Sequence, residues 1–112
     1  MRILQLLNNP NKWTKECLAL TKDGKKVHEH FGYSITEGNK TYETDSMRDA
    51  LSFSLYGALV YCYDVNKRPD IISKLKDGIQ RQTGKYQRIP EYNDDVDRTY
   101  NEVRELLESV NV

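Results

Sequence analysis

The side chains best suited to chemistry lie in "EYNDDVDRTYNEV", residues 91–103. Asn93, Asp94, Asp95 and Asp97 could bind a hard cation there, because magnesium and calcium prefer carboxylate and carbonyl oxygens. The spacing differs from an EF-hand loop, which has a central glycine and a distant glutamate. We favour a structural interpretation, in which Asn93 and Asp94 hydrogen-bond local backbone and hold the loop in place.

A second set of metal-ligating residue types lies nearer the N-terminus. His28 and His30 are two residues apart on a predicted strand and therefore share a face, with Cys17 opposite His30 in the expected hairpin register. Three such ligands with an open position would make a catalytic zinc site. We expect that face to be exposed to solvent, with no carboxylate clearly placed to orient the imidazoles. We therefore favour the interpretation in which these residues bind no metal.

Aromatic residues suggest a binding surface. The chain has eight tyrosines and one tryptophan, and tyrosine supplies contact area and a hydrogen bond with few rotatable bonds. Tyr86 and Tyr92 fall in a predicted loop, where exposure is expected, although packing in the core is a close alternative for tyrosine rings. The residues that we assign to a ligand or partner site are Trp13, Tyr86, Tyr92, Asn93 and Asp94.

Charge and composition argue against several classes of protein. Seventeen basic and seventeen acidic residues cancel, and no run of five like charges occurs, so general nucleic-acid binding is not expected. The longest uncharged run, residues 50–63, is shorter than the roughly 20 residues of a membrane span. The N-terminal apolar run is too short for a signal peptide, so we expect a cytoplasmic protein.

Catalytic motifs and cofactor-binding motifs are not evident. The sequence has no glycine-rich phosphate loop and no "G-x-S-x-G" turn. Cys17 and Cys62 stand far apart in apolar company, which predicts two reduced, partly buried thiols. We therefore assign no catalytic residue and expect no cofactor.

The first half of the chain predicts a short helix and two hairpins. The helix spans residues 3–7 and ends before Pro10. A hairpin follows around Asp23-Gly24, with Lys22 paired to Lys25 across a two-residue turn in which both central residues need positive φ. In this register, four side chains face the core: Leu18, Leu20, Val27 and Phe31. A second hairpin, with its turn at Gly38-Asn39, completes a meander over about residues 15–44.

A central helix is expected over residues 48–63, with Ser46 as its N-cap and Asp49 in a weak capping box. Its residues are apolar almost all round, so it should lie in the middle of the fold. Gly57 costs about 1 kcal/mol relative to alanine inside a helix. This cost is easiest to explain if another element approaches the helix backbone at Gly57.

Two further helices complete the prediction. One begins with Pro69 at its first position and stops at Gly84, with a buried stripe formed by Ile72, Leu75 and Ile79. The last begins at a capping box that runs from Thr99 to Glu102. Its apolar positions at helical spacing are Val103, Leu106, Leu107 and Val110.

Several motifs, taken together, resemble a known family. Trp13, Gly24 in a turn, "SLYGAL" at 54–59 and "YNDDVDRTYNEV" at 92–103 resemble a family of small uncharacterised proteins from bacteria and phages. That family has an N-terminal tryptophan, a "C-L-x-G-A-L" helix and a "W-N-D…T…E-V" segment, in similar order over nearly the whole chain. Ser54 replaces the family's cysteine and Tyr92 its tryptophan. The resemblance implies a shared fold and a phage origin, but no activity.

We therefore predict one α+β domain over residues 1–112, in which a small antiparallel hairpin or meander packs on three to four helices. The function hypothesis is a non-enzymatic binding protein, phage-encoded in one version, that engages a host protein or sequesters a small molecule. The alternative is a small metal-dependent hydrolase that uses residues 93–97. The sequence does not determine the oligomeric state, and a homodimer is one option.

Overall fold

The computed structural model describes residues 1–27 and 50–112. In this part of the chain, five α-helices pack with a three-stranded antiparallel sheet, so the predicted α+β class is confirmed. The predicted hairpin at residues 33–44, with Gly38-Asn39 at its turn, lies outside the described residues, as do Ser46, His28 and His30.

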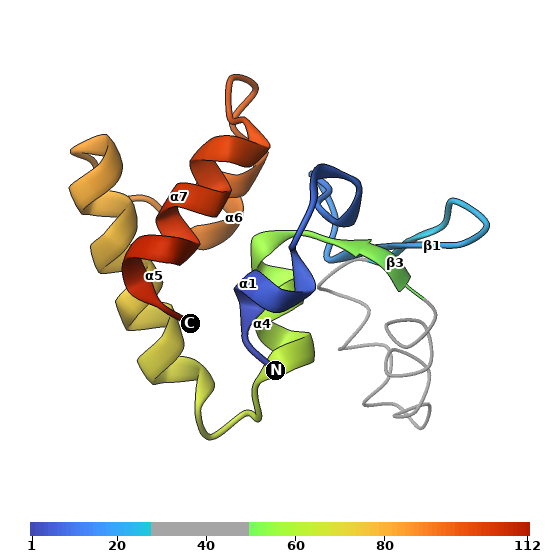
Figure 1. Ribbon diagram of the computed structural model, residues 1–112, viewed down its shortest axis with the longest axis horizontal. Coiled ribbons are helices and arrows are strands. Elements are labelled where there is room, and N and C mark those ends of the chain that lie inside the picture. Colours follow the sequence, from blue (N-terminus) through green and yellow to red (C-terminus); the bar gives the residue numbers. More distant parts are fainter. Residues whose placement is uncertain (28–49) are drawn as a thin grey trace.

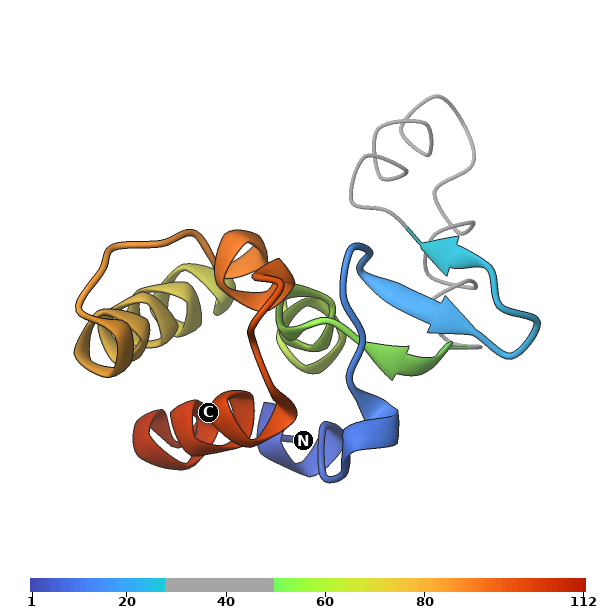
Figure 2. The ribbon, with the colours of Figure 1, turned by 90° about the horizontal axis from the view of Figure 1, so that it is seen from above.

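Helix α4 (Leu55–Cys62) lies at the centre of the fold, as predicted. Figures 1 and 2 both show it between the sheet on one side and the C-terminal helices on the other. Those helices are α5 (Arg68–Thr83), α6 (Ile89–Asp94) and α7 (Tyr100–Val110). The short helix α1 (Ile3–Leu6) packs against α4 and α7 and was also predicted.

The sheet has the strand order β2-β1-β3, with β1 at Ala19–Thr21, β2 at Lys26–Val27 and β3 at Ala50–Phe53. Before β1, a 3-10 turn (Pro10–Lys12) leads to Trp13, which makes an isolated parallel bridge with Phe53. The N-terminal segment thereby lies along the start of α4.

The β1–β2 hairpin is confirmed, but its predicted register is wrong by one residue. Ala19 pairs with Val27, and the Thr21 N–H donates to the Lys25 carbonyl, so the loop has three residues, 22–24. Of these, Gly24 alone has a positive φ, 82°, which suits a three-residue hairpin loop with glycine in the left-handed region.

The change of register alters which residues of β1 face the core. Ala19, predicted to face away from the core, is fully buried, whereas Leu20, predicted to face it, is half-buried. Leu18, just before the strand, and Val27 are buried as predicted. A shift of one residue moves every side chain to the other face of a strand, because side chains alternate. The Thr21 side chain favours the observed register, since its oxygen accepts from the Lys25 N–H at 3.1 Å.

Residues 50–53 form strand β3 rather than the first turn of the predicted helix 48–63. A short apolar run suits either structure, and here pairing with β1 supplies the backbone hydrogen bonds. The helix begins at Leu55, and its N-cap is Ser54, whose hydroxyl oxygen accepts from the Gly57 N–H at 3.0 Å.

The close approach predicted at Gly57 is confirmed. A Cβ atom at this position would lie 1.8 Å from the carbonyl oxygen of Leu18, just before β1. The same carbonyl accepts from the Ser54 N–H at 2.9 Å. Glycine is required here because the start of β1 lies directly against the first turn of α4.

The C-terminal helices match the predicted ends, with three differences. Helix α5 begins at Arg68, so Pro69 is its second residue, and its stripe uses Ile71 in place of the half-buried Ile72. Residues 89–94, predicted as loop, form α6, in which Pro90 occupies the first turn. Gly84 ends α5 with φ 77°, and the Thr99–Glu102 capping box begins α7, both as predicted.

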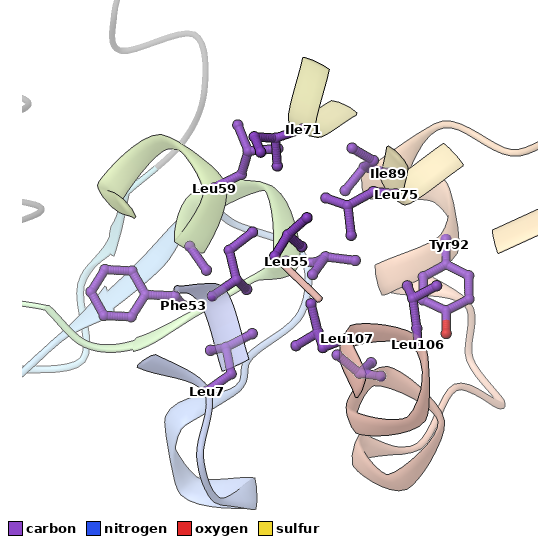
Figure 3. Packing of buried hydrophobic residues seen from close by; sticks show 14 of the residues in the cluster. Leu7, Phe53, Leu55, Leu59, Ile71, Leu75, Ile89, Tyr92, Leu106 and Leu107 are labelled. Carbon is purple, nitrogen blue, oxygen red and sulfur yellow. The ribbon is translucent and has the colours of Figure 1, made fainter. Parts of the chain in front are cut away.

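The core gathers around Leu55. Figure 3 shows its side chain between Leu75 from α5, Leu107 from α7 and Leu7 beside α1. Tyr92 belongs to the same cluster and is fully buried beside Leu106. No helix among the described residues is both long enough and apolar enough to cross a membrane.

Candidate functional site

Three of the predicted site residues, Trp13, Asn93 and Asp94, meet where the segment before β1 passes the end of α6. The indole N–H of Trp13 donates to the Asn93 Oδ1 at 2.7 Å. Asn93 is fully buried, and Asp94 is the last residue of α6. The structure therefore brings together residues that stand about 80 positions apart in the sequence.

Asn93 uses the full hydrogen-bonding capacity of its amide. Its Oδ1 also accepts from the Leu55 N–H at 2.9 Å, while its Nδ2 donates to the Thr14 carbonyl at 3.1 Å and to the Asp94 Oδ1 at 2.9 Å. An asparagine amide has two donors and two acceptor lone pairs, so all are satisfied. We call this set of contacts, made by Trp13, Thr14, Leu55, Asn93 and Asp94, the Asn93 junction.

The structural interpretation of Asn93 was right in kind but wrong in its partners. We predicted bonds to local backbone, whereas three of the four Asn93 bonds go to residues 38 to 80 positions away and the fourth goes to the Asp94 side chain. One side chain thereby links the segment before β1, the start of α4 and the end of α6. An unpaired buried polar group costs about 1 to 3 kcal/mol, so each of these bonds constrains the fold.

Asp94 fixes an unusual backbone conformation at Glu16. The Glu16 N–H donates to the Asp94 Oδ1 at 2.8 Å, and Glu16 has φ 67°, in the left-handed region that ordinary residues rarely adopt. Next to it, the Lys15 Nζ donates to the Asp95 carbonyl at 2.7 Å and lies 5.4 Å from the centre of the Trp13 ring. Lysine thus satisfies a carbonyl at the end of α6.

Cys17 lies beside the Asn93 junction and has the character of a structural thiol. Burial is the main cause that raises its pKa. A hydrogen bond with Thr14 and the Lys26 cation lower the pKa by less, and the Asp94 carboxylate adds a small rise. The thiolate is the nucleophilic and metal-binding form, so Cys17 is poorly suited to either task at neutral pH. The predicted zinc partners, His28 and His30, lie outside the described residues.

The remaining predicted acidic ligands support the turn between α6 and α7. Asp95 Oδ1 accepts from the Asp97 N–H at 3.0 Å, and its other oxygen lies 3.9 Å from the Arg98 guanidinium. Within the described ranges, no group of three or more histidine, cysteine, aspartate or glutamate side chains is placed to hold a metal ion.

The two predicted site tyrosines occupy very different environments. Tyr92 is fully buried, its hydroxyl donates to the Gln82 Oε1, and the Arg98 guanidinium lies 3.9 Å from its ring centre. Burial is the main cause that raises the pKa of Tyr92 to about 12. Tyr86, by contrast, is 76% exposed in the connection between α5 and α6. Of the two, Tyr86 is the one available to a partner.

The structure also contains a hollow that sequence reasoning missed. It has a volume of about 330 Å³ and lies between the start of α1 and the connection from α4 to α5, which are neighbours in Figure 1. Its lining includes Arg2, Gln5, Cys62, Tyr63, Asp64 and Lys67. We call it the Arg2–Lys67 hollow.

Hydrogen bonds hold both walls of this hollow. On one wall, the Arg68 guanidinium donates to the Tyr63 carbonyl at 3.0 Å and to the Val60 carbonyl at 3.1 Å, which caps α4. On the other wall, the Arg2 N–H donates to the Gln5 Oε1 at 2.8 Å, and the Arg2 guanidinium donates to Asn111. The hollow is therefore pre-formed rather than a gap between loose loops.

Residues 2–111 match the DUF6197 family, a family of unknown function. The chain belongs to this family. The predicted membership of a family of uncharacterised proteins is confirmed. The comparison with curated proteins gave no match, and neither did the comparison with solved structures.

Three of the four motifs that carried the resemblance meet at the Asn93 junction of this DUF6197 chain, whereas Gly24 lies apart from it in the β1–β2 loop. Ser54 caps α4 and donates to the Leu18 carbonyl at 3.2 Å, next to the Leu55 N–H that binds Asn93. Trp13 and Asp94 complete the Asn93 junction. Ser54 is thus a buried helix cap, and its oxygen is engaged by backbone groups.

Two signals in the sequence could have pointed to the Arg2–Lys67 hollow. Asp64 and Lys67 directly follow the longest uncharged run, and Arg2 precedes the first apolar residues. Charges at the ends of buried helices indicate exposed positions, so the exposure of these residues could have been predicted. Their spacing in the sequence does not indicate that residues 2 and 67 line the same hollow.

Proposed function

We propose that this protein is a non-enzymatic binding protein that holds a small polar molecule in the Arg2–Lys67 hollow. The observation that carries this proposal is the hollow itself, whose volume of about 330 Å³ falls within the usual 300 to 1,000 Å³ of small-molecule sites. The half-buried Cys62 and Tyr63 form its inner part, and the exposed Arg2, Gln5 and Lys67 offer hydrogen-bond donors at its edge.

The side chains with reactive groups already have structural roles, and this supports binding over catalysis. Asn93, Asp94 and Asp95 accept backbone N–H groups, which accounts for their presence without a reaction. The half-buried Cys17 and Cys62 have pKa values raised mainly by burial, so both thiols stay protonated near neutral pH. The metal-dependent hydrolase stays a prediction, and metal analysis of the purified protein would test it.

Ligand-observed NMR against a library of small polar metabolites tests the proposal. We expect at least one compound to bind, and we expect N-ethylmaleimide on Cys62 to abolish that binding by filling the hollow. The reaction is carried out on Cys17→Ser protein, in which Cys62 is the one remaining thiol, because Cys17 lies outside the hollow lining. The control is the same variant without reagent, and circular dichroism would verify that both samples are folded. No binding by any compound, or binding unaffected by Cys62 modification, would contradict the proposal.

A second candidate function, binding to a protein partner, is favoured by Tyr86. This side chain is 76% exposed, and tyrosine is a frequent anchor in interfaces. If the chain is phage-encoded, the partner would be a protein of the bacterial host. A photo-crosslinking residue at position 86 should capture one defined protein, whereas the same residue at exposed position 76 should not. Equal capture from both positions would count against this function.

A further inference from the structure

We infer that the Arg2–Lys67 hollow selects small anions, in which a carboxylate or phosphate group is bound by Arg2 and Lys67. This inference rests on the proposed function, because it names the class of ligand for the same hollow. It follows from the charges at the edge, from their lack of ion-pair partners among residues 1–27 and 50–112, and from the neutral inner part.

The charged side chains that line the hollow carry a net positive charge. Arg2 and Lys67 contribute two cations, and Asp64 contributes the opposing carboxylate. Across residues 1–27 and 50–112, neither Lys67 nor Asp64 takes part in an ion pair, so the Lys67 ammonium is not neutralised there. An anion in the hollow would supply that missing charge.

Arg2 is held in position for such a ligand. Its guanidinium donates to the Asn111 Oδ1, which fixes the side chain across the end of α7. A guanidinium carries five N–H donors in a planar fork, so the bond to Asn111 leaves others for a carboxylate or phosphate. Lysine adds a compact charge that suits either group.

The inner part of the hollow adds no competing negative charge at neutral pH. Burial is the main cause that raises the pKa of the Cys62 thiol and of the Tyr63 hydroxyl. Both groups are therefore protonated near pH 7. The Tyr63 hydroxyl donates to the Val112 carbonyl at 3.2 Å, which holds its ring in place.

NMR titrations with inorganic phosphate, succinate and the neutral analogue succinamide test the inference. We expect phosphate or succinate to shift resonances of residues 62–67, and succinamide to have little effect. Lys67→Gln and Arg2→Gln should each weaken anion binding about threefold to tenfold, because exposed charges act across a partly screened distance. Asp64→Asn should strengthen binding by a similar factor. Lys76→Gln, which removes the same charge from an exposed position of α5, should leave it unchanged.

The outcomes separate this inference from the function on which it rests. If neutral metabolites bind in the hollow but neither anion does, the ligand class is wrong and the binding function stands. If neither the anions nor any library compound binds, both are wrong. If Lys76→Gln weakens binding as much as Lys67→Gln, the effect comes from net charge and the assignment to this hollow is overturned.

Discussion

The indole N–H of Trp13 donates a 2.7 Å hydrogen bond to the side-chain oxygen of Asn93, which also accepts the first backbone N–H of α4. This shared oxygen joins the N-terminal segment, the central helix and α6. Neither residue is placed to act on an external ligand through those atoms, since the bonds are already made inside the protein. The Asn93 junction is therefore best tested as a determinant of stability.

Asn93→Ala should destabilise the protein by about 3 kcal/mol or more. The change leaves the Trp13 and Leu55 N–H groups and the Thr14 carbonyl without their partner, and each unpaired buried group costs about 1 to 3 kcal/mol. Urea denaturation would measure the loss. The matched control is Asn101→Ala, at an exposed position of α7, which should change stability by less than about 0.5 kcal/mol. Equal transition midpoints for the two variants would refute the role assigned to Asn93.

Tyr92→Ala and Tyr86→Ala should differ sharply, although the two residues stand six positions apart. Tyr92 is fully buried, so its truncation should cost about 3 to 5 kcal/mol. Tyr86 is 76% exposed, so its loss should change the free energy of unfolding by less than about 0.5 kcal/mol. Thermal denaturation of both variants decides the matter. A large loss for Tyr86→Ala would mean that its ring packs in a way that the structure does not show.

Gly57→Ala should destabilise the protein by about 2 kcal/mol or more, although alanine is the better helix former by about 1 kcal/mol. The new Cβ would meet the Leu18 carbonyl oxygen at 1.8 Å, and backbone at the start of β1 must move to admit it. The matched control is Gly78→Ala, whose Cβ would meet the side-chain ends of Val110 and Leu106. Side chains can rotate away, so we expect a smaller loss. A Gly78→Ala variant that is the less stable of the two would contradict this account.

Local signals in the sequence predicted the end of α5 and the start of α7. Gly84 and the Thr99–Glu102 box act on neighbouring backbone groups, so a few adjacent residues suffice to recognise them. The hairpin register was harder, because two loop types suit Asp23-Gly24 and the Thr21 side chain decides between them. Strand β3 depends on β1, which is about 30 residues away, and apolar periodicity carries no such information.

The candidate site shows the same limit, because its long-range contacts could not be predicted from local sequence. Trp13, Asn93 and Asp94 were assigned to a ligand or partner site, and that assignment stays a prediction. In the structure their side chains make internal hydrogen bonds, which their residue types did not indicate. The Arg2–Lys67 hollow had no recognisable motif. It forms because the start of α1 packs beside the end of α4, and that packing follows from the whole core.

Protonation of Glu102 at acid pH should lower the stability of the protein. A hydrogen bond from the Thr99 N–H is the main cause that lowers the pKa of Glu102 below its ordinary value of 4.5, and the nearby Arg98 cation lowers it further. A carboxyl with a lower pKa in the folded chain stabilises that chain above its unfolded pKa. This stabilisation is lost as pH falls through the folded pKa.

Glu102→Gln should therefore be less stable than the wild type at pH 7, and the difference should shrink below pH 4.5. Urea denaturation at pH 7 and pH 3 measures both values, with Glu105→Gln on the same helix as the control. A difference that is the same at both pH values would show that the Glu102 carboxylate does not stabilise the helix start through its charge.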